Sequence, residues 1–79
     1  MSVRVEQEIA YLIGDCRVED AEPLLAYLQS GADRAVDLTG AGQLHTAVVQ
    51  LLIAFKPHVI GPATDTFVQR WLVPVMSAA

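Results

Sequence analysis

Strand-like segments alternate with helix-like segments along this 79-residue chain, and glycine or proline separates most of them. In chain order the segments are a strand at 3–13, a helix at 20–31, a strand at 34–38, a helix at 44–55, a strand at 58–60 and a helix at 64–73. Two strands joined through a helix favour parallel pairing. The order therefore predicts one α/β domain over residues 1–79, with a small mixed sheet that has a parallel portion and helices packed mainly on one face.

The first strand segment carries β-branched and aromatic residues at mixed period-2 spacing. This predicts a strand, or an irregular strand pair, that ends at Gly14. In the helix that follows, we expect Asp20 to accept hydrogen bonds from the amides at the helix start and Gly31 to end the helix in a left-handed conformation. The apolar stripe of this helix consists of Ala21, Leu24, Leu25 and Leu28.

The second helix segment is apolar nearly all round, so we expect it to be central and covered on more than one side. Its apolar residues are Leu44, Val48, Val49, Leu51, Leu52, Ile53 and Phe55. In the last helix we expect Thr64 or Asp65 to cap the start and Pro74 to end it. The expected buried face of that helix consists of Phe67, Val68, Trp71 and Leu72.

Hydrophobic residues make up 53% of the chain and charged residues only 18%, which leaves apolar surface uncovered in a monomer. This balance favours a protein partner or self-association, for example as a homodimer. The net charge is −4 and the five Lys/Arg are scattered singly, so we expect no nucleic-acid binding.

We expect a cytoplasmic protein without direct membrane insertion. The longest apolar run, 47–55, contains Gln50 and is about half as long as a bilayer span, and the first ten residues lack the architecture of a signal peptide. Cys16 is the only cysteine, so no intrachain disulfide can form, which agrees with a reducing compartment.

The glycine-containing loop before the second helix segment has the location of a phosphate-binding loop. The dinucleotide fingerprint, however, requires a third glycine where His45 stands, and a P-loop requires a lysine that this segment lacks. A plain turn at Gly40 and Gly42 is therefore the preferred interpretation. Thr46 is placed either to cap the helix or to be phosphorylated, and capping is the simpler role.

Candidate metal ligands and catalytic residues are sparse. His58 is the only histidine besides His45, and no carboxylate or cysteine stands at a usual metal-ligand spacing from either. No Ser/His/Asp or Cys/His arrangement stands out, so we expect no metal, no cofactor and no enzymatic activity. The charged cluster at 15–20 is a solvated loop or the rim of a binding site, and Cys16 is a small, half-buried residue rather than a reactive thiol.

Two stretches together resemble STAS domains, the fold of the anti-sigma-factor antagonists. The stretch "YLIGDCRVEDAEPLLAYLQ" is similar to the family's strand, Gly-acidic turn and following helix, and "RAVDLTGAGQLHTAVVQLL" to its next strand, loop and hydrophobic helix. Asp37 matches the aspartate that closes the family's strand, Thr46 its first loop hydroxyl, and Ala47 the serine that is phosphorylated in the antagonists. Two positions depart from the family pattern: His45 replaces an aspartate, and Val48 replaces a glycine.

The resemblance implies a non-enzymatic interaction module that regulates or assembles a partner protein in signalling or transport. The partner would be a kinase-type regulator or a transporter subunit, since some members with Thr-Ala at this position belong to lipid-transport complexes. The expected partner-binding or regulatory residues are Asp37, Thr39, Gly40, Gly42, His45, Thr46 and Val49. One alternative is a small-ligand or anion sensor that uses the Thr39–Thr46 loop, and another is a metal- or histidine-dependent enzyme.

Overall fold

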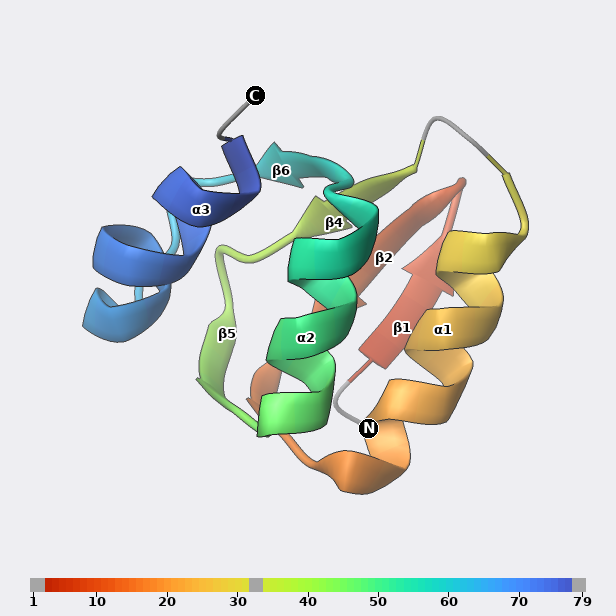
Figure 1. Ribbon diagram of the computed structural model, residues 1–79, viewed down its shortest axis with the longest axis horizontal. Coiled ribbons are helices and arrows are strands. Elements are labelled where there is room, and N and C mark those ends of the chain that lie inside the picture. The colour runs from red at the N-terminus through yellow and green to blue at the C-terminus, as the bar shows by residue number, and fades with distance from the viewer. Residues whose placement is uncertain (1–2, 32–33, 78–79) are drawn as a thin grey trace.

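A four-stranded mixed sheet forms the base of the fold in the computed structural model, which describes residues 3–31 and 34–77 (Figure 1). In spatial order its strands are β1 (Val3–Glu6), β2 (Ile9–Leu12), β4 (Ala35–Asp37) and β6 (His58–Ile60). β1 and β2 pair as an antiparallel hairpin, whereas β2, β4 and β6 are parallel to one another. The predicted mixed sheet with a parallel portion is confirmed.

A two-residue turn joins β1 to β2, so the first strand segment is the irregular strand pair and not a single strand. Gln7 and Glu8 form this turn with φ angles of 51° and 65°. Two consecutive positive φ angles are typical of the tight turns whose twist matches that of the strands they join. Neither residue is the Asn or Gly that usually marks such a turn, which is why the sequence pattern left both interpretations open.

A second, two-stranded parallel sheet consists of β3 (Gly14–Cys16) and β5 (Ala41–Leu44). The sequence patterns predicted neither strand. Cys16 and Leu44 are register partners in it, so Leu44 belongs to a strand and the following helix begins later than expected, at Thr46.

Helices α1 (Ala21–Gln29) and α2 (Thr46–Phe55) lie side by side on one face of the four-stranded sheet (Figure 1). Beneath them, Ala10 and Val36 are register partners and are fully buried. The row of side chains on the opposite face is half-buried or exposed, and consists of Arg4, Tyr11, Asp37 and Ile60. The helices therefore pack mainly on one face, as predicted.

The start of α1 differs from the prediction because a short 3-10 helix, η1 (Val18–Asp20), precedes it. The backbone is already helical at Asp20, and the carboxylate of Asp20 accepts a hydrogen bond from the Arg17 N–H at 2.8 Å. Asp20 therefore caps η1 and does not bind the first amides of α1.

The prediction that Gly31 ends α1 in a left-handed conformation is wrong. The helix ends at Gln29, and both the N–H and the hydroxyl of Ser30 donate to the Tyr27 carbonyl oxygen, at 3.1 and 2.5 Å. These bonds satisfy the helix end without a left-handed residue, and Gly31 does not have a positive φ. The left-handed position occurs instead at the end of α2, where Lys56 has a φ of 46°.

The coverage of α2 is narrower than the sequence pattern predicted. Val48 and Leu52 are fully buried, but Ile53 and Phe55 are 37% and 42% exposed. The sheet lies beneath α2 and α1 lies beside it, so the outward side of α2 is left open (Figure 1).

The last helical segment consists of a π-helical turn, η2 (Val68–Leu72), followed by α3 (Val73–Ser77). Asp65 caps its start, since the carboxylate accepts a hydrogen bond from the Val68 N–H at 3.1 Å. One of the two expected caps is thereby confirmed. Pro74 does not end the helix as expected, because the helical backbone continues without a break from η2 through Pro74 to Ser77.

The buried side of this segment is also narrower than expected. Val68, Leu72 and Met76 are buried, whereas Phe67 and Trp71, both expected in the core, are 56% and 61% exposed. Val68, Leu72 and Met76 follow one another at intervals of four residues, and Phe67 and Trp71 do so one position earlier. The inner and outer residues therefore form two separate stripes, and only the inner stripe meets the core.

This arrangement predicts unequal costs for two neighbouring truncations. Leu72→Ala should lower the free energy of unfolding by about 2–5 kcal/mol, because it removes a buried side chain. Trp71→Ala should cost less than about 1 kcal/mol, because the indole is largely exposed. Urea unfolding followed by far-UV circular dichroism measures both. Equal losses would contradict the two-stripe assignment.

Candidate functional site

The β3–β5 strand pair brings the starts of both major helices together. At one end of the pair the Gly14 N–H donates to the Gly40 carbonyl oxygen at 2.8 Å. At the other end the His45 N–H donates to the Cys16 carbonyl oxygen, also at 2.8 Å. Because β3 leads into η1 and α1, and β5 leads into α2, these bonds fix the two helix starts relative to each other.

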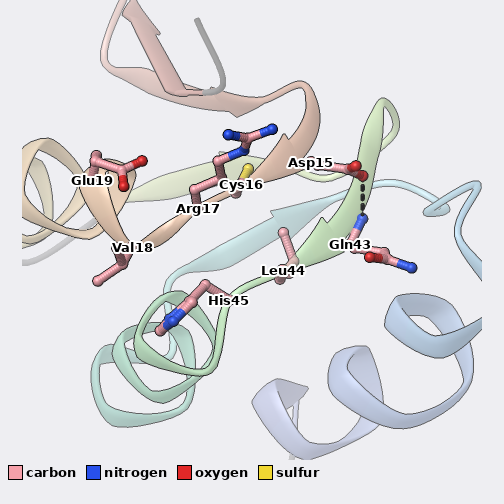
Figure 2. Close-up of a pocket in the computed structure, with 8 residues that line it drawn as sticks. All are labelled: Asp15, Cys16, Arg17, Val18, Glu19, Gln43, Leu44 and His45. Carbon is pink, nitrogen blue, oxygen red and sulfur yellow. Dashed lines mark hydrogen bonds between the residues drawn. The ribbon is translucent and has the colours of Figure 1, made fainter.

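Gly42 lies in β5 at a point where β3 approaches closely. A Cβ at this position would come within 2.5 Å of the Asp15 Oδ1 atom and 3.2 Å of the Gly14 carbonyl carbon. That Oδ1 atom accepts a hydrogen bond from the Gln43 N–H at 2.9 Å (Figure 2). Gly42 therefore serves the contact between the two strands and is not part of a turn.

Asp37 and Thr39 form a hydrogen-bonded turn at the end of β4. The Asp37 Oδ1 atom accepts bonds from the Thr39 N–H at 2.9 Å and from the Thr39 hydroxyl at 2.5 Å. The Thr39 carbonyl oxygen accepts a further bond from the Thr64 hydroxyl. Aspartate commonly stabilises turns in this way, by binding the backbone two residues further on. Both predicted site residues thus have structural roles.

His45, and not Thr46, caps α2. The Nδ1 atom of His45 accepts a hydrogen bond from the Ala47 N–H at 3.0 Å, and its carbonyl oxygen accepts one from the Val49 N–H at 3.0 Å. Thr46 is the first residue of the helix, and its side chain is exposed. The prediction that Thr46 caps α2 is therefore wrong, because His45 already binds the Ala47 N–H at the start of the helix.

The predicted site residues fall into two groups at opposite ends of β5. Asp37, Thr39 and Gly40 lie before this strand, and His45, Thr46 and Val49 lie after it, with Gly42 between them. A four-residue strand spans about 13 Å. The amides near Gly40 therefore do not converge with His45 on one small ligand, and the geometry gives the anion-sensor alternative no support.

A depression of about 500 Å³ lies between the two helix starts (Figure 2). Its lining residues are Asp15, Cys16, Arg17, Val18, Glu19, Gln43, Leu44 and His45. The charged cluster at 15–20 therefore borders a concave surface next to the start of α2. The sequence alone did not decide whether this cluster is a solvated loop or the rim of a binding site.

Cys16 is 2% exposed at this depression. Burial, together with the nearby Asp20 and Asp15 carboxylates, raises the pKa of the Cys16 thiol from 9.0 to about 11. The thiol is therefore protonated at neutral pH, and the thiolate that would act as a nucleophile is disfavoured. Cys16 therefore behaves as a small apolar residue, and it is more deeply buried than the half-buried position that was expected.

Across residues 3–31 and 34–77, no group of three or more His, Cys, Asp or Glu side chains is arranged to hold a metal ion. In the same residues, every helix is too short or too polar to cross a bilayer.

A matched pair of glycine substitutions tests the strand contact at Gly42. Gly42→Ala should lower the free energy of unfolding by about 1–3 kcal/mol, because the methyl group displaces the Asp15 carboxylate and presses on the Gly14 backbone. Gly40→Ala should be neutral or slightly stabilising, because nothing lies within 4 Å of a Cβ there. Thermal unfolding distinguishes the two, and an equal effect of both would refute the close contact.

Comparison with known proteins yields no match to a family model, to a curated protein or to a solved structure.

Proposed function

We propose that this chain is a non-enzymatic, STAS-like protein-binding module that regulates or assembles a partner through the start and outward side of α2. The partner is a kinase-type regulator or a transporter subunit, and the module works in the cytoplasm. Support comes from the surface chemistry of α2, from the position of Thr46 and from the resemblance of two sequence stretches to the family.

The composition of α2 carries this proposal. None of its ten residues is charged, although the helix lies at the surface. Its outward ridge consists of Thr46, Gln50, Ile53 and Ala54, which follow at i, i+4, i+7 and i+8 and are all exposed. Thr46 and Gln50 are polar, but the ridge lacks the charged residues that surface helices normally carry on the side that faces solvent. An uncharged outward ridge is instead typical of a face that another protein covers.

Thr46 stands at the end of this ridge, where the depression between the helix starts begins. Its exposed side chain follows His45, which lines that depression. A negative charge at this first helical position is compatible with the helix itself, because it faces the positive end of the helix dipole. It would nevertheless place a charge on the ridge of α2, which otherwise carries none.

Ala47 occupies the position of the family's phosphorylated serine, and it has no hydroxyl. Docking through this face therefore does not depend on phosphorylation at residue 47. We propose that the module binds its partner constitutively, and that Thr46 is the residue at which a modification or a substitution would interrupt binding.

Charge introduced at Thr46 should weaken partner binding. The tagged chain is cross-linked in its native cell to identify the partner, which is then purified and titrated against the wild type, Thr46→Glu and Gln7→Glu. We expect Thr46→Glu to raise the Kd by about tenfold or more, equivalent to about 1.4 kcal/mol. Gln7→Glu adds the same charge at the exposed hairpin turn and should leave the Kd unchanged.

Thermal unfolding serves as the control for folding. Thr46→Glu should retain the melting temperature of the wild type, because glutamate is favourable in the first turn of a helix. Equal affinity of Thr46→Glu and wild type for the purified partner would rule out the α2 start as the binding site.

A further inference from the structure

An open apolar groove runs between α1 and α2. Its lining residues are Val18, Ala21, Glu22, Leu25, Ala47, Gln50, Leu51 and Ala54. The side chains that the two helices bury fully are others, among them Leu24, Leu28, Val48 and Leu52. Ala21 and Leu51 of the groove pack against this core from outside. The groove is thus the outer surface of the helix pair, and it adjoins the ridge of α2 through Gln50 and Ala54.

Three alanines give the groove its depth. Ala21 lies on α1, and Ala47 and Ala54 lie on α2, so short side chains leave the space between the helices unfilled. Leu25 and Leu51 are half-buried and line the same space from opposite helices. Only Glu22 and Gln50 contribute polar side chains to the lining.

The one charged side chain in the lining of this groove, Glu22, is acidic. Glu19 and Glu22 are exposed on the η1 and α1 side. Residues 18–29 and 46–55 contain no Lys or Arg, so neither helix supplies a cation to balance these carboxylates. The nearest cation in sequence is Arg17, which lines the depression between the helix starts (Figure 2).

We propose that the partner inserts an amphipathic helix into this groove, with an apolar stripe against the alanines and leucines and with lysine or arginine residues beside Glu19 and Glu22. This inference rests on the proposed protein-binding function and specifies the chemistry of the partner. An amphipathic helix presents apolar residues at i, i+3, i+4 and i+7, which suits a groove formed by two neighbouring helices. Opposite charges at the rim set the orientation and select the partner.

A small apolar molecule suits this surface less well. Pockets for small molecules are concave and typically cover about 70–90% of the ligand. The groove between α1 and α2 is open along the outer side of both helices, and its charged rim matches a long, laterally charged ligand better than a compact neutral one.

Three synthetic peptides test the assignment. The first has about 14 residues, ~21 Å long as a helix, with leucines at helical spacing and lysines on both flanks. The second carries glutamates in place of the lysines, and the third has the composition of the first in a scrambled order. In fluorescence anisotropy titrations, we expect the lysine peptide to bind at least about tenfold more tightly than either of the others.

Two variants and two matched controls locate the binding on the chain. Glu22→Lys reverses the rim charge, and Glu8→Lys makes the same change at a side chain that is 90% exposed on the hairpin turn. Ala54→Arg fills the groove with a charged side chain, and Gln7→Arg adds the same charge at the turn. Each groove variant should raise the Kd of the lysine peptide by about tenfold, and each control should raise it by less than about twofold.

The groove variants replace exposed residues, so circular dichroism should show a wild-type fold for both. Raising the salt concentration from about 0.1 M to about 1 M shortens the Debye length from about 10 Å to about 3 Å. This change should weaken binding of the lysine peptide to the wild-type chain.

The outcomes separate this inference from the proposed function. Equal binding of all three peptides, or loss of binding in the hairpin controls, would overturn the basic-helix assignment. If no peptide binds while the purified native partner still responds to Thr46→Glu, the groove assignment fails and the proposed function stands. If the native partner is also insensitive to Thr46→Glu, both fail.

Discussion

Three parallel strands laid side by side in chain order determine where the two main helices lie. Each step from β2 to β4 and from β4 to β6 passes through one helix, and such crossovers share one hand in nearly all proteins. Both helices consequently lie on the same face and become neighbours (Figure 1). The groove between α1 and α2, and the depression between their starts, are both consequences of this one pairing pattern.

A buried tyrosine holds the N-terminal hairpin and α1 to the parallel strands. The Tyr27 hydroxyl lies 2.6 Å from the Glu8 carbonyl oxygen and 2.8 Å from that of Ala35, and it accepts a hydrogen bond from the Ala35 N–H at 3.0 Å. The Arg34 guanidinium lies 5.3 Å from the centre of the ring. One side chain of α1 thus contacts both the hairpin turn and the first residue of β4, so the opposite side of α1 remains available to border the groove.

Hydrophobic periodicity predicts the order of strands and helices, but it does not predict several local features. The sequence does not predict β5, because "AGQL" lacks the β-branched and aromatic residues that mark strands, and because its pairing with β3 depends on a tertiary contact at Gly42. Helix-capping preferences favour Thr46 as the cap of α2, because hydroxyl residues commonly cap helices, yet the Nδ1 atom of His45 takes that role. The apolar pattern predicts one buried face that includes Phe67 and Trp71, but it does not show that only the stripe with Val68 and Leu72 meets the core. The sequence identifies the start of α2 as a candidate site. It does not predict the groove beside it, because that groove is lined by both α1 and α2.

Among the described residues, exposed apolar side chains lie both at the α1–α2 groove with its adjoining ridge and along the outer stripe of the last helical segment, and only the groove and its ridge are proposed to bind the partner. Hydroxyl-radical footprinting of the purified chain, alone and with its purified partner, distinguishes them directly. The account predicts that oxidation of Leu25, Leu51 and Ile53 falls in the complex while that of Phe67 and Trp71 is unchanged. Protection of Phe67 and Trp71 with unchanged oxidation of Leu25, Leu51 and Ile53 would contradict it.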